Sequence, residues 1–133
     1  YNDENRVTLV EFTKEVKPED CTGPLELTPT NVQSLINEVR RINTGGGTRQ
    51  DIALKLVYND YLNANKGFSG NSEDTFTFLI TDGAPVRSSN SQPNELGGPN
   101  DAASTTANTI YGQIKGWANQ VKTKSTLTTI GMI

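Results

Sequence analysis

The 133-residue sequence contains no histidine and only one cysteine, Cys21. Histidine is the commonest general base and the usual partner of a nucleophilic serine or cysteine, so its absence removes the machinery of most hydrolases. One cysteine without histidine cannot form an intrachain disulfide or the usual zinc site. We therefore expect a chain that is not an enzyme.

Long apolar runs and blocks of like charge are missing as well. No stretch approaches the roughly 20 apolar residues of a membrane span. The 12 basic and 15 acidic residues are interspersed and give a net charge of −3. No basic stripe is available for nucleic acid or for an anionic membrane surface. The polar first residues are no signal peptide, and the length suits one domain.

Three segments have the composition of strands. Residues 6–13 (RVTLVEFT) are rich in β-branched and aromatic residues, and residues 125–133 form a last strand. Residues 75–81 (TFTFLIT) have a continuously apolar centre, typical of an internal strand in a covered parallel sheet. The turn-rich segment around residues 15–24 is flanked by two candidate edge strands, at residues 14–16 and 25–27.

The residues after the turn-rich segment have the pattern of a helix. Thr28 or Thr30 can cap a helix in which Pro29 occupies the first turn. Its apolar positions repeat at helical spacing and make one apolar face, at Val32, Leu35, Ile36 and Val39.

Two further helices are predicted, at about residues 48–63 and 102–122. The second helix repeats Leu54, Val57, Tyr58 and Tyr61, and the third has a long apolar stripe that includes Trp117 and Val121. We expect Tyr58, Tyr61 and Trp117 to lie in or near the core.

The order strand, helix, helix, strand, helix, strand predicts an α/β fold with a mostly parallel sheet. In such sheets ligands bind beyond the carboxyl ends of the strands. Two features lie at those ends: the loop Gly45-Gly46-Gly47-Thr48, and Asp82-Gly83 directly after residues 75–81. A threonine hydroxyl and a carboxylate suit part of an Mg²⁺ shell. Taken singly, Thr48 is most simply a helix cap and Asp82-Gly83 a turn.

In this order, the segments GGT with Ala53-Leu54 and LITDG at residues 79–83 resemble those of the von Willebrand factor type A family. The resemblance covers residues 1–133, from the family's second strand through its fifth. It implies a Rossmann-like sheet flanked by helices and a metal-ion-dependent adhesion site. Thr48 and Asp82 would help to hold Mg²⁺ or Mn²⁺, beside the loop glycines Gly46, Gly47 and Gly83. An acidic group of a protein or matrix partner would complete the metal shell.

The chain departs from the family at the Asp-x-Ser-x-Ser segment and the central strand that carries it. Asp101-Ala-Ala-Ser-Thr105 has the wrong spacing to replace that segment. Without the central strand two strand edges lack partners. We expect the rest of the same polypeptide, or another chain, to supply the strand.

Two functions follow from the resemblance. The first is a metal-dependent adhesion module on an extracellular or cell surface, such as a bacterial surface protein or pilus adhesin. The alternative is a structural or assembly module of the same fold without a working metal site. The polar insertion at residues 87–101 is either a specificity loop or a solvated connection.

Overall fold

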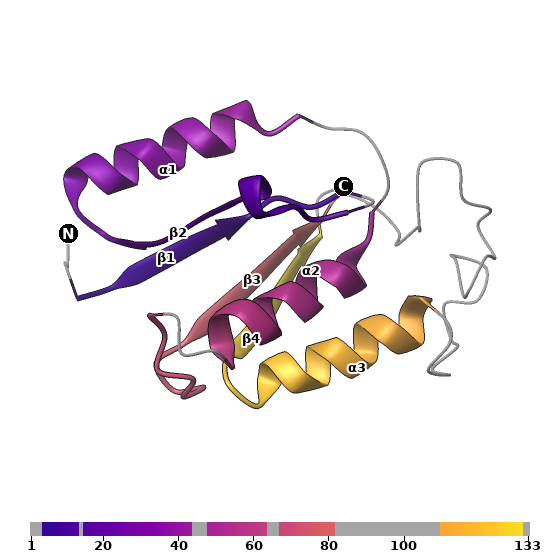
Figure 1. Cartoon of the computed structure of the whole chain (residues 1–133). Coiled ribbons are helices and arrows are strands. Elements are labelled where there is room, and N and C mark those ends of the chain that lie inside the picture. The colour runs from indigo at the N-terminus through magenta and orange to yellow at the C-terminus, as the bar shows by residue number, and fades with distance from the viewer. Residues whose placement is uncertain (1–3, 14, 44–47, 64–66, 82–109, 132–133) are drawn as a thin grey trace.

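The computed structural model describes residues 4–13, 15–43, 48–63, 67–81 and 110–131. Helices and strands are mixed along the chain (Figure 1), which confirms the α/β class in this coarse form. The elements in chain order are β1 (Arg6–Val10), the 3-10 helix η1 (Pro18–Asp20), β2 (Cys21–Glu26), α1 (Pro29–Arg41), α2 (Gln50–Leu56), the π-helix η2 (Val57–Leu62), β3 (Phe76–Thr81), α3 (Ile110–Lys122) and β4 (Thr126–Gly131).

The strands β3 and β4 pair in parallel, as the sequence predicts. Their register runs without a break from Phe76 opposite Thr126 to Thr81 opposite Gly131. Parallel neighbours need a crossover connection, and α3 lies within it. The carboxyl ends of both strands therefore lie at the same end of this two-stranded sheet.

The strands β1 and β2 are antiparallel, so the prediction of a mostly parallel sheet holds for only one of the two pairs. Arg6 lies opposite Glu26 and Val10 opposite Cys21. Residues 11–20 between the strands are too few for a crossover, so the chain reverses direction instead. Gly23 allows the close pairing, because its φ is +112° and a Cβ there would lie 2.5 Å from the carbonyl oxygen of Val7.

The edge strand predicted at residues 14–16 is wrong for residues 15 and 16, which are not in a strand, and residue 14 lies outside the described residues. The candidate at residues 25–27 is only the end of β2, which begins at Cys21. The sequence did not predict the start of this strand, because Gly23 and Pro24 are typical of turns.

The core lies between α2, η2, α3 and one face of β3–β4. Its buried side chains are Leu54, Leu62, Leu79 and Val121. The rings of Tyr58 and Trp117 pack against this cluster with centroids 6.2 Å apart. Tyr61 meets Phe68 edge to face at 6.5 Å. The near-core positions predicted for the three aromatic residues are confirmed.

The helix α1 begins as predicted, and its apolar face is partly exposed. Thr28 is its N-cap, accepting a hydrogen bond of 3.2 Å from the Asn31 backbone N–H, and Pro29 is its first residue. On the predicted apolar face, Ile36 is 40% and Val39 53% exposed. Among the described elements this helix packs mainly on β2, which covers only part of the stripe.

The other two helices differ from prediction at their ends. The second begins at Gln50 rather than Thr48 and changes from α to π geometry at Val57. In the third, the segment 110–122 is helical as predicted, and residues 102–109 lie outside the described part of the chain. The insertion at residues 87–101 also lies outside it.

Candidate functional site

The start of α2 is held against the carboxyl end of β1. The backbone N–H of Arg49 donates to the carbonyl oxygen of Thr13 at 2.8 Å. Thr48, one residue earlier, is half-buried and forms an isolated β-bridge. The predicted metal ligand Thr48 is therefore next to the chain that leaves β1.

The next residue of the helix reaches the carboxyl end of β3. Nε2 of Gln50 donates to the hydroxyl of Thr81 at 3.3 Å, and Gln50 is 8% exposed. Two successive residues, Arg49 and Gln50, thus bind the carboxyl-end segments of strands from different sheets. These contacts agree with the prediction from the sequence that residues 12–13 and the carboxyl end of β3 lie at the same end of the sheet.

The predicted site is described only in part. Thr48 lies at this edge, and Thr81 immediately precedes Asp82 in the sequence. Asp82, Gly46, Gly47 and Gly83 lie outside the residues that the structure describes. Metal coordination by Thr48 and Asp82 stays a prediction.

The competing interpretation of Thr48 as the cap of α2 is wrong. The N-cap is Arg49, and no side chain makes a capping hydrogen bond there. The first turn contains instead a bidentate ion pair, in which Nε and Nη2 of Arg49 donate to the two carboxylate oxygens of Asp51, each at 2.7 Å. The charge-assisted bonds to Asp51 raise the pKa of the Arg49 guanidinium.

This ion pair was missed from the sequence, although the order Arg-x-Asp at a helix start was a usable signal. Asp51 is 6% exposed and both of its carboxylate oxygens accept from Arg49. The pair fixes the first turn and leaves Asp51 poorly suited to hold a cation. Any carboxylate ligand at this edge must come from another residue.

The chemistry of the edge suits a hard cation in part. Thr48 offers a neutral oxygen, and Mg²⁺ prefers oxygen ligands with one or two carboxylates and several waters. Within residues 4–81 and 110–131, excluding the gaps between them, no group of three or more histidine, cysteine, aspartate or glutamate residues is placed to hold a metal. The predicted carboxylate, Asp82, follows the last described residue of β3.

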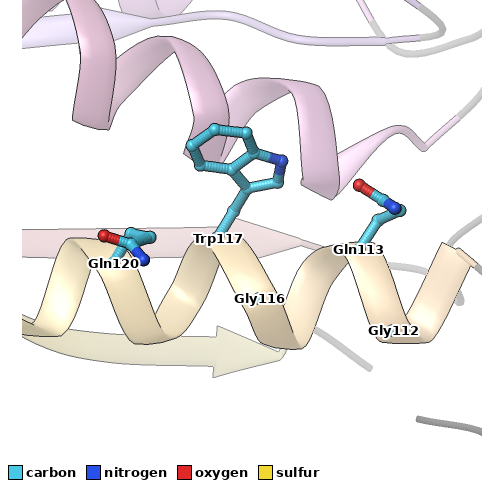
Figure 2. Close-up of a pocket in the computed structure, with 5 residues that line it drawn as sticks. All are labelled: Gly112, Gln113, Gly116, Trp117 and Gln120. Carbon is cyan, nitrogen blue, oxygen red and sulfur yellow. The ribbon is translucent and has the colours of Figure 1, made fainter. Parts of the chain in front are cut away.

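A separate hollow of about 290 Å³ lies along α3 (Figure 2). The described residues that line it belong to this helix: Gly112, Gln113, Gly116, Trp117 and Gln120. Trp117 projects toward the neighbouring helix, where Nζ of Lys55 lies 5.7 Å from its ring centroid. Among the residues that the structure describes, the lining includes neither Thr48 nor a charged side chain.

Cys21 is a protonated thiol at neutral pH. Burial raises its pKa, although a hydrogen bond with Tyr61 opposes the shift. Burial, followed by the interactions with Cys21, raises the pKa of Tyr61 to about 12. A protonated thiol is a weak nucleophile and a weak metal ligand, and the contact with Tyr61 gives Cys21 a packing role.

Comparison with known proteins gave no relative: no protein-family model, no curated protein and no solved structure matches the chain. None of the helices in the described part of the chain is long and apolar enough to cross a membrane.

Proposed function

We propose that the chain is a metal-dependent binding module of the von Willebrand factor type A kind. Its ligand site would lie at the carboxyl edge of the strands, on an extracellular or cell surface, and take a protein or matrix partner. One observation carries the proposal: adjacent residues of the α2 start bind Thr13 after β1 and Thr81 at the end of β3.

These contacts support the pairing of Thr48 with Asp82. Thr48 directly precedes Arg49, and Asp82 directly follows Thr81, so each proposed ligand adjoins one partner of an observed contact. A bound Mg²⁺ or Mn²⁺ would supply the positive charge that an acidic group of the partner coordinates. The glycines Gly46, Gly47 and Gly83 would let the backbone approach closely.

A binding role agrees better with the side chains than catalysis does. The chain has no histidine. Its single thiol has a raised pKa, and the buried carboxylate of Asp51 is committed to Arg49. A general base needs a free proton acceptor, which neither group provides.

Calorimetric titration with Mg²⁺ and Mn²⁺ tests the proposal. The Asp82→Ala variant should lose metal binding, and Thr48→Ala should weaken it by about tenfold or more. Glu73→Ala is the matched control, because this exposed carboxylate precedes β3 rather than following it. It should bind metal as the unaltered chain does.

A folded chain that is indifferent to both metals would contradict the adhesion site. The alternative function, a structural or assembly module of the same fold, would then be preferred. For both functions, we propose that the rest of the same polypeptide or another chain supplies a strand to the sheet.

A further inference from the structure

The hollow along α3 lies beside the core face of this helix. Ile114 and Val121 pack against or within the core. Gln113 and Gln120 each come one residue earlier, and Trp117 lies between them in the sequence, so the three share the neighbouring face. In Figure 2 the indole ring of Trp117 stands between the side chains of the two glutamines. An aromatic ring flanked by two amide groups thus lines about 290 Å³ of open space.

Gly116 gives this hollow an open floor that the described packing does not require. It is exposed in the interior of α3, where glycine is among the least favourable residues for a helix. A Cβ at this position would meet no atom of the described residues within 4 Å. No close approach within the described chain therefore explains the glycine. Its missing side chain keeps the space beside the ring of Trp117 open.

The groups that line the hollow match the chemistry of a neutral sugar. The C–H face of a pyranose ring is apolar, and it can stack on the electron-rich face of an aromatic ring. Sugar hydroxyls both donate and accept hydrogen bonds, as the side-chain amides of Gln113 and Gln120 do. Nζ of Lys55 lies 5.7 Å from the ring centroid of Trp117, but Lys55 is not a lining residue. Among the described residues, the lining therefore offers no counter-charge to an anionic sugar or a phosphate.

The size of the hollow limits the length of the ligand. Its volume of about 290 Å³ is at the lower end of the range of ligand pockets, which begins at about 300 Å³. We therefore expect it to hold one or two sugar rings. Grooves that bind polyproline-type peptides are lined by several aromatic residues, whereas Trp117 is the one aromatic residue in the described lining.

We propose that the hollow along α3 is a binding site for a neutral mono- or disaccharide. One pyranose ring stacks on Trp117, and the amides of Gln113 and Gln120 bind hydroxyls on either side of it. Gly116 leaves the room that the sugar ring occupies. The site goes beyond the proposed metal-dependent function, because other residues line it and none of their groups needs a metal ion.

Trp117 is the only tryptophan of the chain, so its fluorescence reports directly on the hollow. The full chain is titrated with cellobiose, maltose, lactose and chitobiose in the presence of a metal chelator. The proposal expects a saturable change in emission with at least one of these disaccharides. N-acetylneuraminic acid, which carries a carboxylate, should bind more weakly. The chelator keeps this result distinct from the metal titration that tests the proposed function.

Three substitutions locate the sugar on the helix. Gln120→Ala should weaken binding by about three- to tenfold, because one hydrogen-bonding group is lost. Gly116→Ala should weaken it as well, because its methyl group enters the hollow. The same change should raise the thermal denaturation midpoint, since alanine favours the helix, so weaker binding cannot be ascribed to unfolding. The matched control is Asn119→Ala, an exposed amide of α3 outside the lining, which should change binding by less than about twofold.

Other results would overturn the proposal. No saturable change with any of the disaccharides would show that the hollow does not bind a sugar. Equal effects of Gln120→Ala and Asn119→Ala would place the binding elsewhere. Tighter binding of N-acetylneuraminic acid than of the disaccharides would contradict an uncharged ligand. A short polyproline peptide that binds more tightly than any disaccharide, with the same sensitivity to Gln120→Ala, would assign the hollow to a protein partner.

Discussion

The two faces of β3 differ sharply, although neighbouring residues of one strand supply them. Leu79 is 8% exposed and belongs to the core with Leu54 and Val121, under α2 and α3. Phe78 and Ile80, on either side of it, are 62% and 52% exposed. The same alternation separates a packed face from an open one along the whole strand.

This contrast bears on the apolar centre of the strand, Phe78, Leu79 and Ile80. A strand with one wet face alternates apolar and polar residues, whereas TFTFLIT puts large apolar residues on both faces. The composition thus fits a strand covered on both sides, and the described elements cover only one.

The largest expected effect compares adjacent residues of β3. Leu79→Ala should lower the free energy of unfolding by about 3 kcal/mol, because it leaves a cavity in the core. Ile80→Ala should change it by less than about 1 kcal/mol, because the side chain is already half in water. Urea denaturation of both variants measures the difference. Equal losses would contradict the division into a packed and an open face.

A smaller effect is expected at the buried polar end of the packed face. Ser125 is 1% exposed, and its hydroxyl lies 2.6 Å from that of Thr77 and 3.2 Å from the carbonyl oxygen of Thr75. Ser125→Ala should lower the free energy of unfolding by about 1–2 kcal/mol, because it leaves these groups short of a partner. The exposed control Thr129→Ala should lie within about 0.5 kcal/mol of the unaltered chain. A neutral Ser125→Ala would show that the network contributes nothing to stability.

The smallest effect is a loss of stability in alkali from the contact of Cys21 in β2 with Tyr61 in η2. Both groups are neutral when protonated, and folding raises both pKa values, that of Tyr61 from 10.0 to about 12 and that of Cys21 above 9.0. Their contribution is therefore full below about pH 9 and is lost as the pH rises toward 12. Denaturation midpoints followed from neutral to alkaline pH should fall, and Tyr61→Phe should flatten the decline. An unchanged slope in that variant would contradict the assignment to Tyr61.

The sequence predicted those parts of the fold whose signals are local. The Thr28 cap, the apolar stripe that ends at Val121 and the strand at residues 76–81 are all recovered. It missed β2, because Gly23 and Pro24 are typical of a turn. Their role in the close pairing depends on contacts with β1, which a local sequence signal does not contain. It marked the apolar face of α1, but the part of that face that is buried depends on which elements cover the helix.

The sequence predicted where the candidate site lies in the fold but not the side-chain contacts within it. The rule for parallel strands placed residues 12–13 and the end of β3 at one edge, and the contacts of Arg49 and Gln50 agree. The bidentate bonds between Arg49 and Asp51 could not be derived, because side chains two residues apart in a helix do not usually meet. Here the pair forms because Arg49 is the N-cap, outside the regular helix.

The most direct test of the account is the position of a bound Mn²⁺ ion in solution. Paramagnetic Mn²⁺ broadens the backbone amide signals of residues near it, so a titration followed by nuclear magnetic resonance locates the ion. The proposed function predicts that Thr48, Gln50 and Thr81 broaden first and that Asp82→Ala abolishes the effect. Broadening that begins instead at the acidic turn of Glu73 and Asp74, or that is uniform along the chain, would contradict a metal-dependent site at the carboxyl edge of the strands.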